Sequence, residues 1–179
     1  MAADLDQLIP DFRPTIINLL FKCMERGVEM RPYFTLRDPF EQARLWRQSR
    51  STREIEAKIE EFEKEGADFL AHCLRSVGPQ HGDPVTNTPP GFSWHQWGEA
   101  VDCFWLVSGK AVWSTRKVID GVNGYHVYAE EAEKLGLTAG GHWRNFKDWP
   151  HVQFRAVSNP GKVMSLTDID VQMKLRFGS

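Results

Sequence analysis

The stretch SWHQWGEAVD, residues 93–102, contains the residues on which the interpretation of this chain depends. His95 and Asp102 stand seven positions apart in it, with Gly98 between them. A turn at Gly98 would let both side chains converge on one metal ion, because glycine accepts backbone conformations that other residues avoid. Two ligands do not complete a site, so a third must come from elsewhere in the chain.

His151 is the candidate for the third ligand. Two histidines and one aspartate are the minimum protein ligand set of a catalytic zinc site, which keeps a fourth position for water. Asp148 lies three positions before His151 and is a candidate base for the proton of that water. These residues together predict a metal-activated nucleophile beside a carboxylate, as the hydrolysis of an amide requires.

Each of these residues also has a structural interpretation. A single histidine near a turn, such as His95, is more often hydrogen-bonded than metal-bound, His151 could simply begin a strand, and Asp148 could be a turn residue. Asp102 differs, because it lies inside the apolar run AVDCFW, where a buried carboxylate is costly unless it is paired or metal-bound. His142 is close enough in sequence to be a substitute ligand.

The composition excludes several classes of protein. The 22 basic and 24 acidic residues leave a formal charge of -2, which argues against a nucleic-acid partner. Three cysteines without a CxxC pair predict reduced thiols and no thiolate metal site. The first residues lack a basic segment and no apolar run is long enough for a membrane span, so we expect synthesis in the cytoplasm without a signal peptide and no membrane insertion.

Hydrophobic periodicity predicts a mixture of helices and strands. Helices are expected at residues 11–26, 38–47, 52–77 and 125–135, and strands at 29–36, 99–106, 111–113 and 152–154. Pro32 indicates that the first strand lies at a sheet edge. Gly66 is a point at which the third helix can be interrupted, and residues 78–91 read as a functional loop.

The motifs resemble those of a family of zinc peptidases that act on bacterial cell walls. The matching pattern is Ser93-x-His95-x-x-Gly98-x-Ala100-x-Asp102, followed by Asp148-x-Pro150-His151, within a resemblance that extends over about residues 33–154. The family includes D-alanyl-D-alanine carboxypeptidases and dipeptidases, and L-alanyl-D-glutamate endopeptidases of phage endolysins. The resemblance implies that His95, Asp102 and His151 bind zinc, that Asp148 is the general base, and that Ser93 supports the substrate or a ligand.

A further family motif, an arginine within Tyr-Arg-Ser followed by a glutamine, is matched in spacing by Arg37 and Gln42, but without the tyrosine and serine. The resemblance implies that Arg37 polarises the scissile carbonyl and stabilises the oxyanion. Gln42 would bind substrate, although it could equally be a solvated helix residue. Aspartate at position 148, with the sequence GGHW at 140–143, is more similar to the endopeptidase branch, whereas many dipeptidases and carboxypeptidases have glutamate there.

The resemblance implies an α+β fold of the Hedgehog and DD-peptidase type. We expect a small, largely antiparallel sheet with helices packed on one side and zinc at the open face. One domain is expected over residues 1–179, with a core at about 30–156 and a helical insertion at 52–77 that could reshape the cleft.

The expected function is zinc-dependent hydrolysis of peptidoglycan stem peptides at the L-alanyl–D-glutamate bond, by a monomer that reaches the cell wall after release from the cell. Two alternatives stay open at this stage. One is a D-alanyl-D-alanine carboxypeptidase or dipeptidase, and the other is a zinc-stabilised binding module without catalysis.

Overall fold

The computed structural model describes residues 3–178, which divide into two compact units. Unit 1 holds residues 3–36 and 97–156, and unit 2 holds residues 37–96 and 157–178. The single domain expected over residues 1–179 stays a prediction, and residues 1, 2 and 179 lie outside the described part. No helix among the described residues is long and apolar enough to cross a membrane.

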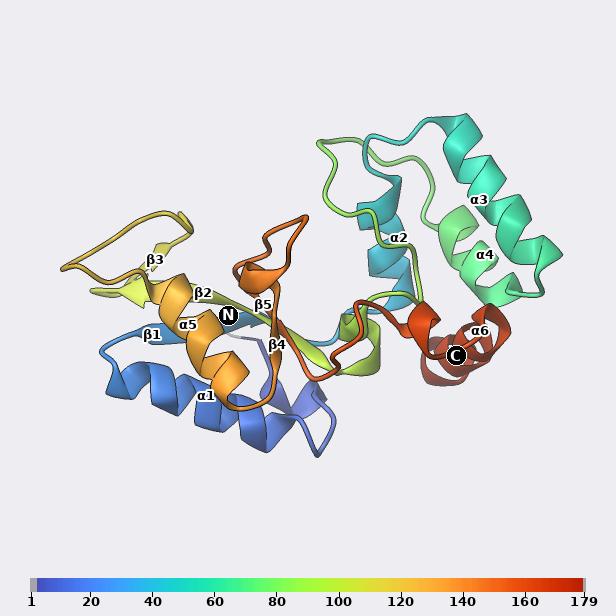
Figure 1. Cartoon of the computed structure of the whole chain (residues 1–179). Coiled ribbons are helices and arrows are strands. Elements are labelled where there is room, and N and C mark those ends of the chain that lie inside the picture. Colours follow the sequence, from blue (N-terminus) through green and yellow to red (C-terminus); the bar gives the residue numbers. More distant parts are fainter. Residues whose placement is uncertain (1–2, 179) are drawn as a thin grey trace. The chain divides into compact units, whose positions relative to one another are not determined.

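Unit 1 is built on a small antiparallel sheet (Figure 1). Its strands are β1 (Glu29–Phe34), β2 (Ala100–Val107), β3 (Lys110–Val112), β4 (Thr138–Ala139) and β5 (His151–Gln153). The order is β1-β2-β5-β4, and β3 pairs with β2 beside β5. The strand that contains Pro32 therefore lies at the edge, as predicted, where a residue without a backbone donor costs least.

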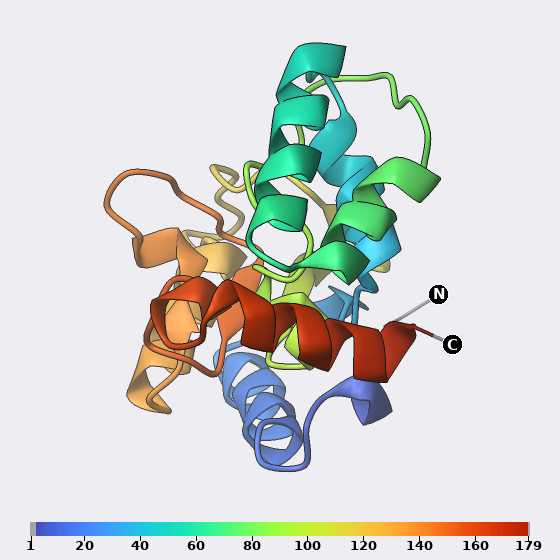
Figure 2. The same ribbon diagram turned by 90° about the vertical axis from the view of Figure 1, so that its right-hand side faces the viewer.

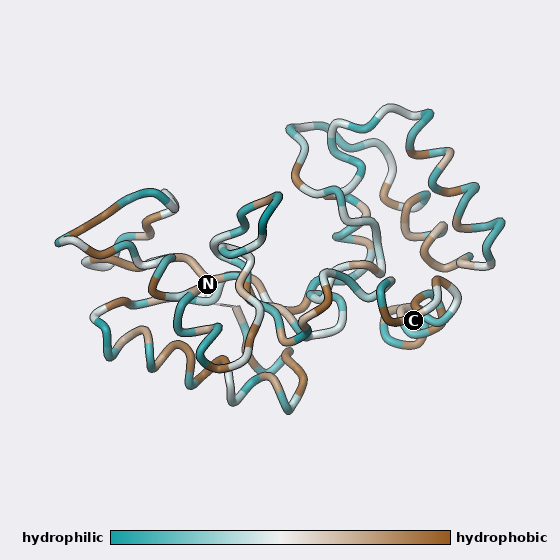
Figure 3. Tube along the Cα trace, viewed as in Figure 1, coloured by the Kyte–Doolittle hydropathy of each residue, from teal (hydrophilic) through white to brown (hydrophobic). Residues whose placement is uncertain are grey.

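Two helices, α1 (Arg13–Glu25) and α5 (Gly124–Lys134), pack together on one face of this sheet (Figure 1). Hydrophobic and hydrophilic residues alternate along α1, as Figure 3 shows, so each turn presents apolar side chains to the core. Alternate β2 residues face the same core, which contains Ile16, Leu19, Val101, Cys103, Trp105, Tyr125, Tyr128 and Val152. The predicted α+β class, with a small antiparallel sheet covered by helices on one side, is confirmed.

Unit 2 is helical, with α2 (Pro39–Arg47), α3 (Thr52–Lys64), α4 (Asp68–Ser76) and α6 (Leu166–Phe177), in which α3 and α4 run side by side (Figure 2). Three of these helices are preceded by a residue whose side chain accepts a hydrogen bond from a free backbone N–H group of the first turn. The Asp38 side chain accepts from the amide of Glu41, Ser51 forms a capping box with Glu54, and Ser165 caps α6. Helix α6 is not among the helices predicted from the sequence.

The predicted helix over residues 52–77 is two helices, interrupted at the expected glycine. Gly66 has a φ of 76°, which is a conformation that ends a helix and that glycine adopts without strain. The second helix, α4, has Ala67 at its N-cap and no side-chain hydrogen bond from that residue. Asp170 of α6 replaces the missing cap, since its Oδ1 accepts from the amide of Leu70 at 2.8 Å. One turn of α4 is thus stabilised by a residue 100 positions away.

The remaining short elements are 3-10 turns. They are η1 (Leu5–Gln7), η2 (Trp94–Trp97), η3 (Gly140–His142) and η4 (Pro160–Lys162). Two of them lie near candidate site residues, because η2 contains His95 and precedes β2, and η3 precedes the segment that carries Asp148 and His151.

Candidate metal centre

The turn before β2 is shaped by Gly98. Its φ is 70°, and a Cβ at this position would lie 2.9 Å from the backbone oxygen of Gln7. The amide of Ile9 also donates to the oxygen of Gly98 at 3.0 Å, so the N-terminal segment packs directly on the turn. A larger residue would therefore meet both backbone strain and a steric clash. The turn at Gly98 that the sequence predicted is present.

Asp102 and His151 lie directly opposite each other in the antiparallel pair of β2 and β5. Side chains at such positions leave the sheet on the same face, with their Cβ atoms about 5 Å apart. Asp102 Oδ1 lies 3.0 Å from His151 Nδ1, and both residues are buried. Val101 and Cys103 belong to the core beneath the helices, so Asp102 points to the opposite, open face.

His95 lies in η2, the turn within which the boundary of the two units falls. One potential ligand atom from each of His95, Asp102 and His151 can be chosen so that all three lie within 4.8 Å of one another. Two donors of a tetrahedral zinc ion, each about 2.0–2.2 Å from the metal, are separated by roughly 3.5 Å. Two imidazole nitrogens and a carboxylate oxygen at such separations fit zinc, and the three residues singled out by the sequence are the ones brought together.

The second nitrogen of His151 has a partner that the sequence analysis missed. Gln153 Oε1 lies 3.1 Å from His151 Nε2, and the Gln153 amide group donates to the backbone oxygen of Arg155 at 2.6 Å. The amide therefore presents its oxygen, which can only accept, so a proton on Nε2 would donate to Gln153 and leave the lone pair of Nδ1 for a metal ion beside Asp102. The sequence contained a signal for this contact. Side chains alternate between the two faces of a strand, so residues 151 and 153 share a face.

The electrostatics of His151 reflect its carboxylate neighbours. Burial lowers the pKa of His151, but the hydrogen bond and charge of Asp102, the charge of Asp148 and the contact with Gln153 outweigh it, so that the pKa is raised. Metal-free His151 is thus a stronger base than a free histidine. A cation at the Nδ1 position would replace the proton that these carboxylates favour.

Gly140 and Gly141 allow the segment that carries Asp148 to pack closely beside β5. Its amide donates to the oxygen of Gly140 at 3.0 Å, and its own oxygen accepts from the amide of His151 at 3.1 Å. A Cβ on Gly140 would lie 2.4 Å from the Asp148 oxygen, and one on Gly141 would lie 2.3 Å from the Trp149 ring. Both glycines therefore permit a close approach of the segment before β5. Asp148 is half-buried and close enough to act on the pKa of His151.

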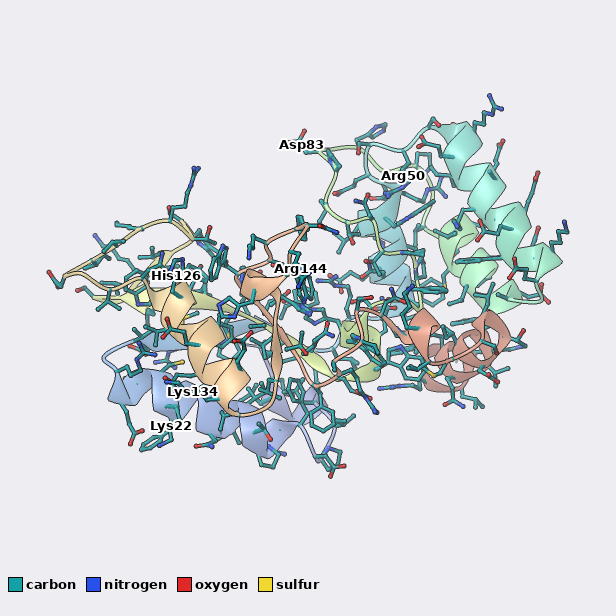
Figure 4. All side chains as sticks on the ribbon, viewed as in Figure 1. Lys22, Arg50, Asp83, His126, Lys134 and Arg144 are labelled. Carbon is teal, nitrogen blue, oxygen red and sulfur yellow. The ribbon has the colours of Figure 1, made fainter. Side chains whose placement is uncertain are left out.

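The ring of Trp149 is held on its other side by α5. The ring of His126, labelled in Figure 4, stacks on it with a centroid distance of 4.3 Å. His142, the possible substitute ligand, pairs instead with Glu133 through Nδ1 at 2.7 Å and is not in the three-residue group. Trp143 lies against His151, with ring centroids 5.2 Å apart. Aromatic rings thus surround the segment that carries Asp148 and His151.

In unit 2, Arg37 and Gln42 contact each other. Arg37 Nη1 donates to Gln42 Oε1 at 2.9 Å, and the buried Gln42 donates in turn to the oxygen of Thr88 at 2.7 Å. The amide of Arg37 donates to the backbone oxygen of His95 at 3.3 Å. Gln42 is therefore not a solvated helix residue. Ser93 accepts a long hydrogen bond, 3.4 Å, from the amide of His95. The functional roles of all three residues stay predictions.

The three cysteines are free, buried and unsuited to nucleophilic chemistry. Burial raises the pKa of Cys23 and of Cys73 to about 12 and raises that of Cys103 further. The Cys103 thiol also accepts a hydrogen bond from the Tyr128 hydroxyl at 3.3 Å. Protonated, enclosed thiols are structural, so the chemistry rests on the group of histidines and carboxylates.

A comparison with known protein families agrees with the position of the candidate metal site in the chain. Residues 86–154 match a family model described as D-alanyl-D-alanine carboxypeptidase. The matched segment contains His95, Asp102, Asp148 and His151 but neither Arg37 nor Gln42, and it confirms the resemblance drawn from the motif. No curated protein matches the chain significantly.

Among solved structures, the chain aligns with the L-Ala D-Glu endopeptidase ChiX of Serratia marcescens, with 18% identity and a TM-score of 0.42. That alignment covers 84% of this chain and 83% of ChiX.

Proposed function

We propose that this chain, whose residues 86–154 match a family of cell-wall peptidases, is a zinc-dependent peptidase that hydrolyses the L-alanyl–D-glutamate bond of peptidoglycan stem peptides. The single observation that carries the proposal is the convergence of His95, Asp102 and His151 within 4.8 Å. The protein acts as a hydrolase on a soluble or wall-bound peptide, as a monomer, after release from the cell.

His95, Asp102 and His151 would hold the metal, with Nδ1 of His151 as the donor that Gln153 makes available. A zinc ion in this position lowers the pKa of a coordinated water towards neutrality and polarises a carbonyl group. Gln153 keeps the ring of His151 in one orientation, and a fixed orientation lowers the cost of assembling the ligands. All four residues are buried, which strengthens electrostatic interactions at the site.

Asp148 would take the proton of the attacking water at its carboxylate and return it to the departing amine. Its half-buried position and its electrostatic interaction with His151 support this assignment. Arg37 would stabilise the negative charge that develops on the carbonyl oxygen. The hydrogen bond from the Arg37 side chain to Gln42 holds the guanidinium in place. The backbone amide of Arg37 donates to the backbone oxygen of His95, which connects Arg37 to the segment that carries a candidate ligand.

The choice of scissile bond rests on the aspartate at position 148 and on the GGHW segment at 140–143, which resemble the endopeptidase branch. One observation favours a second candidate, because the matching family model is described as a D-alanyl-D-alanine carboxypeptidase. The two reactions leave different products. An endopeptidase separates the disaccharide with its L-alanine from a peptide that begins with D-glutamate, whereas a carboxypeptidase releases free D-alanine.

Digestion of a purified disaccharide pentapeptide followed by mass spectrometry tests the proposal. The zinc-loaded protein is expected to yield the disaccharide–L-alanine fragment. Free D-alanine as the product would favour the second candidate. A protein that binds one zinc ion per chain but cleaves neither bond would be a binding module, and a protein without stoichiometric zinc would contradict the metal assignment.

A further inference from the structure

Four aromatic side chains form a continuous cluster on the open face of the sheet in unit 1. They are Tyr33 and Phe34 of β1, Phe104 of β2, and Trp113, which follows β3. Trp113 lies 5.1 Å from both Tyr33 and Phe104 between ring centroids, Tyr33 lies 6.3 Å from Phe104, and Phe34 lies 6.5 Å from Tyr33. We refer to these four residues as the aromatic platform.

The aromatic platform continues the face on which the candidate metal ligands lie. Phe104 follows Asp102 by two positions on β2, and the intervening Cys103 belongs to the core beneath the helices. Residues two apart on a strand share a face. Phe34 is the direct partner of Asp102 in the pairing of β1 with β2, after an irregularity at Pro32. One end of the platform therefore borders Asp102, and the rest extends from it along β2.

The platform is open to solvent. Trp113 is 57% exposed, and the other three rings are half-buried. A contiguous aromatic surface of this kind is unusual on a protein unless it contacts a partner or ligand. Arg31 lies opposite Phe104 in the strand pairing and donates to Glu29 Oε1 at 2.7 Å. The charges compensate, so the surface suits an uncharged ligand with a flat apolar face.

We propose that the aromatic platform binds the N-acetylated aminosugar ring to which the stem peptide is attached. This inference rests on the proposed function, because it places the scissile bond at the site of Asp102 and His151. A pyranose ring presents C–H bonds on one face, and these pack on the electron-rich faces of aromatic rings. The sugar is neutral at the ring and carries its polar hydroxyl groups at the edge, which matches an apolar surface open to water.

The spacing along the strand fits the covalent structure of this substrate. L-alanine is joined to the sugar through a lactyl ether, so the sugar ring lies about two residue lengths, roughly 7 Å, from the scissile carbonyl. Two residues of a β-strand, the separation of Phe104 from Asp102, span about 6.7 Å. A substrate that runs along β2 with its carbonyl beside Asp102 would thus place its sugar over the ring of Phe104, next to Trp113. A D-alanyl–D-alanine bond, several residues from the sugar, would not place it there.

The test compares two substrates of the same peptide sequence, one attached to its disaccharide and one with only an acetyl group on L-alanine. Wild-type protein is expected to have the higher kcat/KM on the glycan-linked substrate. Trp113→Ala is expected to reduce the ratio of the two kcat/KM values by about 3- to 10-fold, the size of one lost aromatic contact. Phe21→Ala is the matched control, since Phe21 is 58% exposed on α1, the helix that covers the other face, and the ratio should not change.

If Trp113→Ala lost kcat/KM equally on both substrates, or lost none, the proposal would be overturned. Failure of the proposed function has a different signature, because wild type would then cleave the L-alanyl–D-glutamate bond of neither substrate. In that case the disaccharide itself is titrated into the protein while the indole N–H signal of Trp113 is followed by NMR. A saturable shift of this signal that Tyr33→Ala weakens would support the glycan site without hydrolysis, whereas no shift, or a shift that Tyr33→Ala leaves unchanged, would exclude it.

Discussion

The two units use buried polar side chains in different ways. In unit 1, Asp102, His151 and Gln153 contact one another across two strands. In unit 2, Asp170 accepts from a backbone group instead, the amide of Leu70. Side chains that satisfy backbone atoms hold helices and loops in place, whereas side chains arranged around one another leave donors directed at a common point. The first kind contributes to stability, and the second kind indicates function.

This comparison predicts that substitutions in the two units differ in kind. Substitutions around His151 in unit 1 should reduce catalysis or metal affinity more than the free energy of unfolding. Substitutions of helix-capping residues in unit 2, such as Asp170, should reduce the free energy of unfolding.

The largest effect is expected for Asp148→Asn in unit 1. Asparagine has nearly the same shape but cannot take a proton, so kcat should fall by about 10²- to 10⁴-fold, the usual contribution of a general base. Zinc content and the thermal unfolding midpoint should stay close to those of wild type. Muropeptide hydrolysis with metal analysis of the same sample measures both. Asp11→Asn, at an exposed carboxylate, is the control, and wild-type rates in Asp148→Asn would refute the role of the base.

Next in size is the effect of Gln153→Met on metal affinity. Methionine keeps the volume but cannot accept the Nε2 proton of His151, so the affinity for zinc should fall by about 10- to 100-fold, as for other partners of metal-binding histidines. Competition with a chromophoric chelator measures this without reference to activity. Gln172→Ala, at an exposed position of α6, should bind zinc as wild type does. Equal affinities of Gln153→Met and wild type would mean that Gln153 only fills space.

In unit 2, Asp170→Ala should lower the free energy of unfolding by about 1–2 kcal/mol, because it removes the only side-chain cap that the described structure shows for α4. Asp170→Asn keeps an acceptor oxygen and should lose less. Urea denaturation at neutral pH gives both values. An alanine variant as stable as the asparagine variant would show that the hydrogen bond to Leu70 contributes nothing.

The carboxyl group of Asp170 should also make the free energy of unfolding depend on pH. Burial raises the pKa of Asp170 above its ordinary value of 3.8, despite the backbone hydrogen bonds that lower it. The folded state then holds the proton more tightly, so this contribution to stability is fully present below pH 3.8 and is lost as the pH rises through the raised pKa. Relative to Asp170→Asn, wild type should therefore become less stable over that range. Denaturation of both proteins across acidic pH reveals the slope.

The smallest effect is expected for Gly66→Ala, between α3 and α4. No atom lies within 4 Å of the added Cβ, so only the φ of 76° opposes the change. The left-handed conformation should cost about 1 kcal/mol, at the low end for an L-residue. Gly66→Asn should cost less, because asparagine tolerates this conformation. Thermal unfolding of both variants measures the difference, and a stabilised alanine variant would contradict the assignment.

Local signals made most of the fold predictable. Asp38 and the Ser51–Glu54 capping box mark helix starts within a few residues, and Gly66 marked the break between α3 and α4. The candidate ligands could be predicted because their residue types and motif are unusual. The cap by Asp170 and the aromatic platform could not, because each depends on which distant segments pack together, whereas alternation along β5 was a usable signal for Gln153. A pairing register follows from packing over the whole sheet and is not written in any one stretch.

The pairing of Asp102 with His151 has a consequence for how the chain is held together. The two residues are 49 positions apart, and an ion bound by both would join them as a covalent bond does. A disulfide that closed a loop of this length would stabilise the folded chain by about 4 kcal/mol through the entropy of the unfolded state. The candidate site would therefore also be a reversible crosslink, which the chain would gain when an ion binds and lose when a chelator removes it.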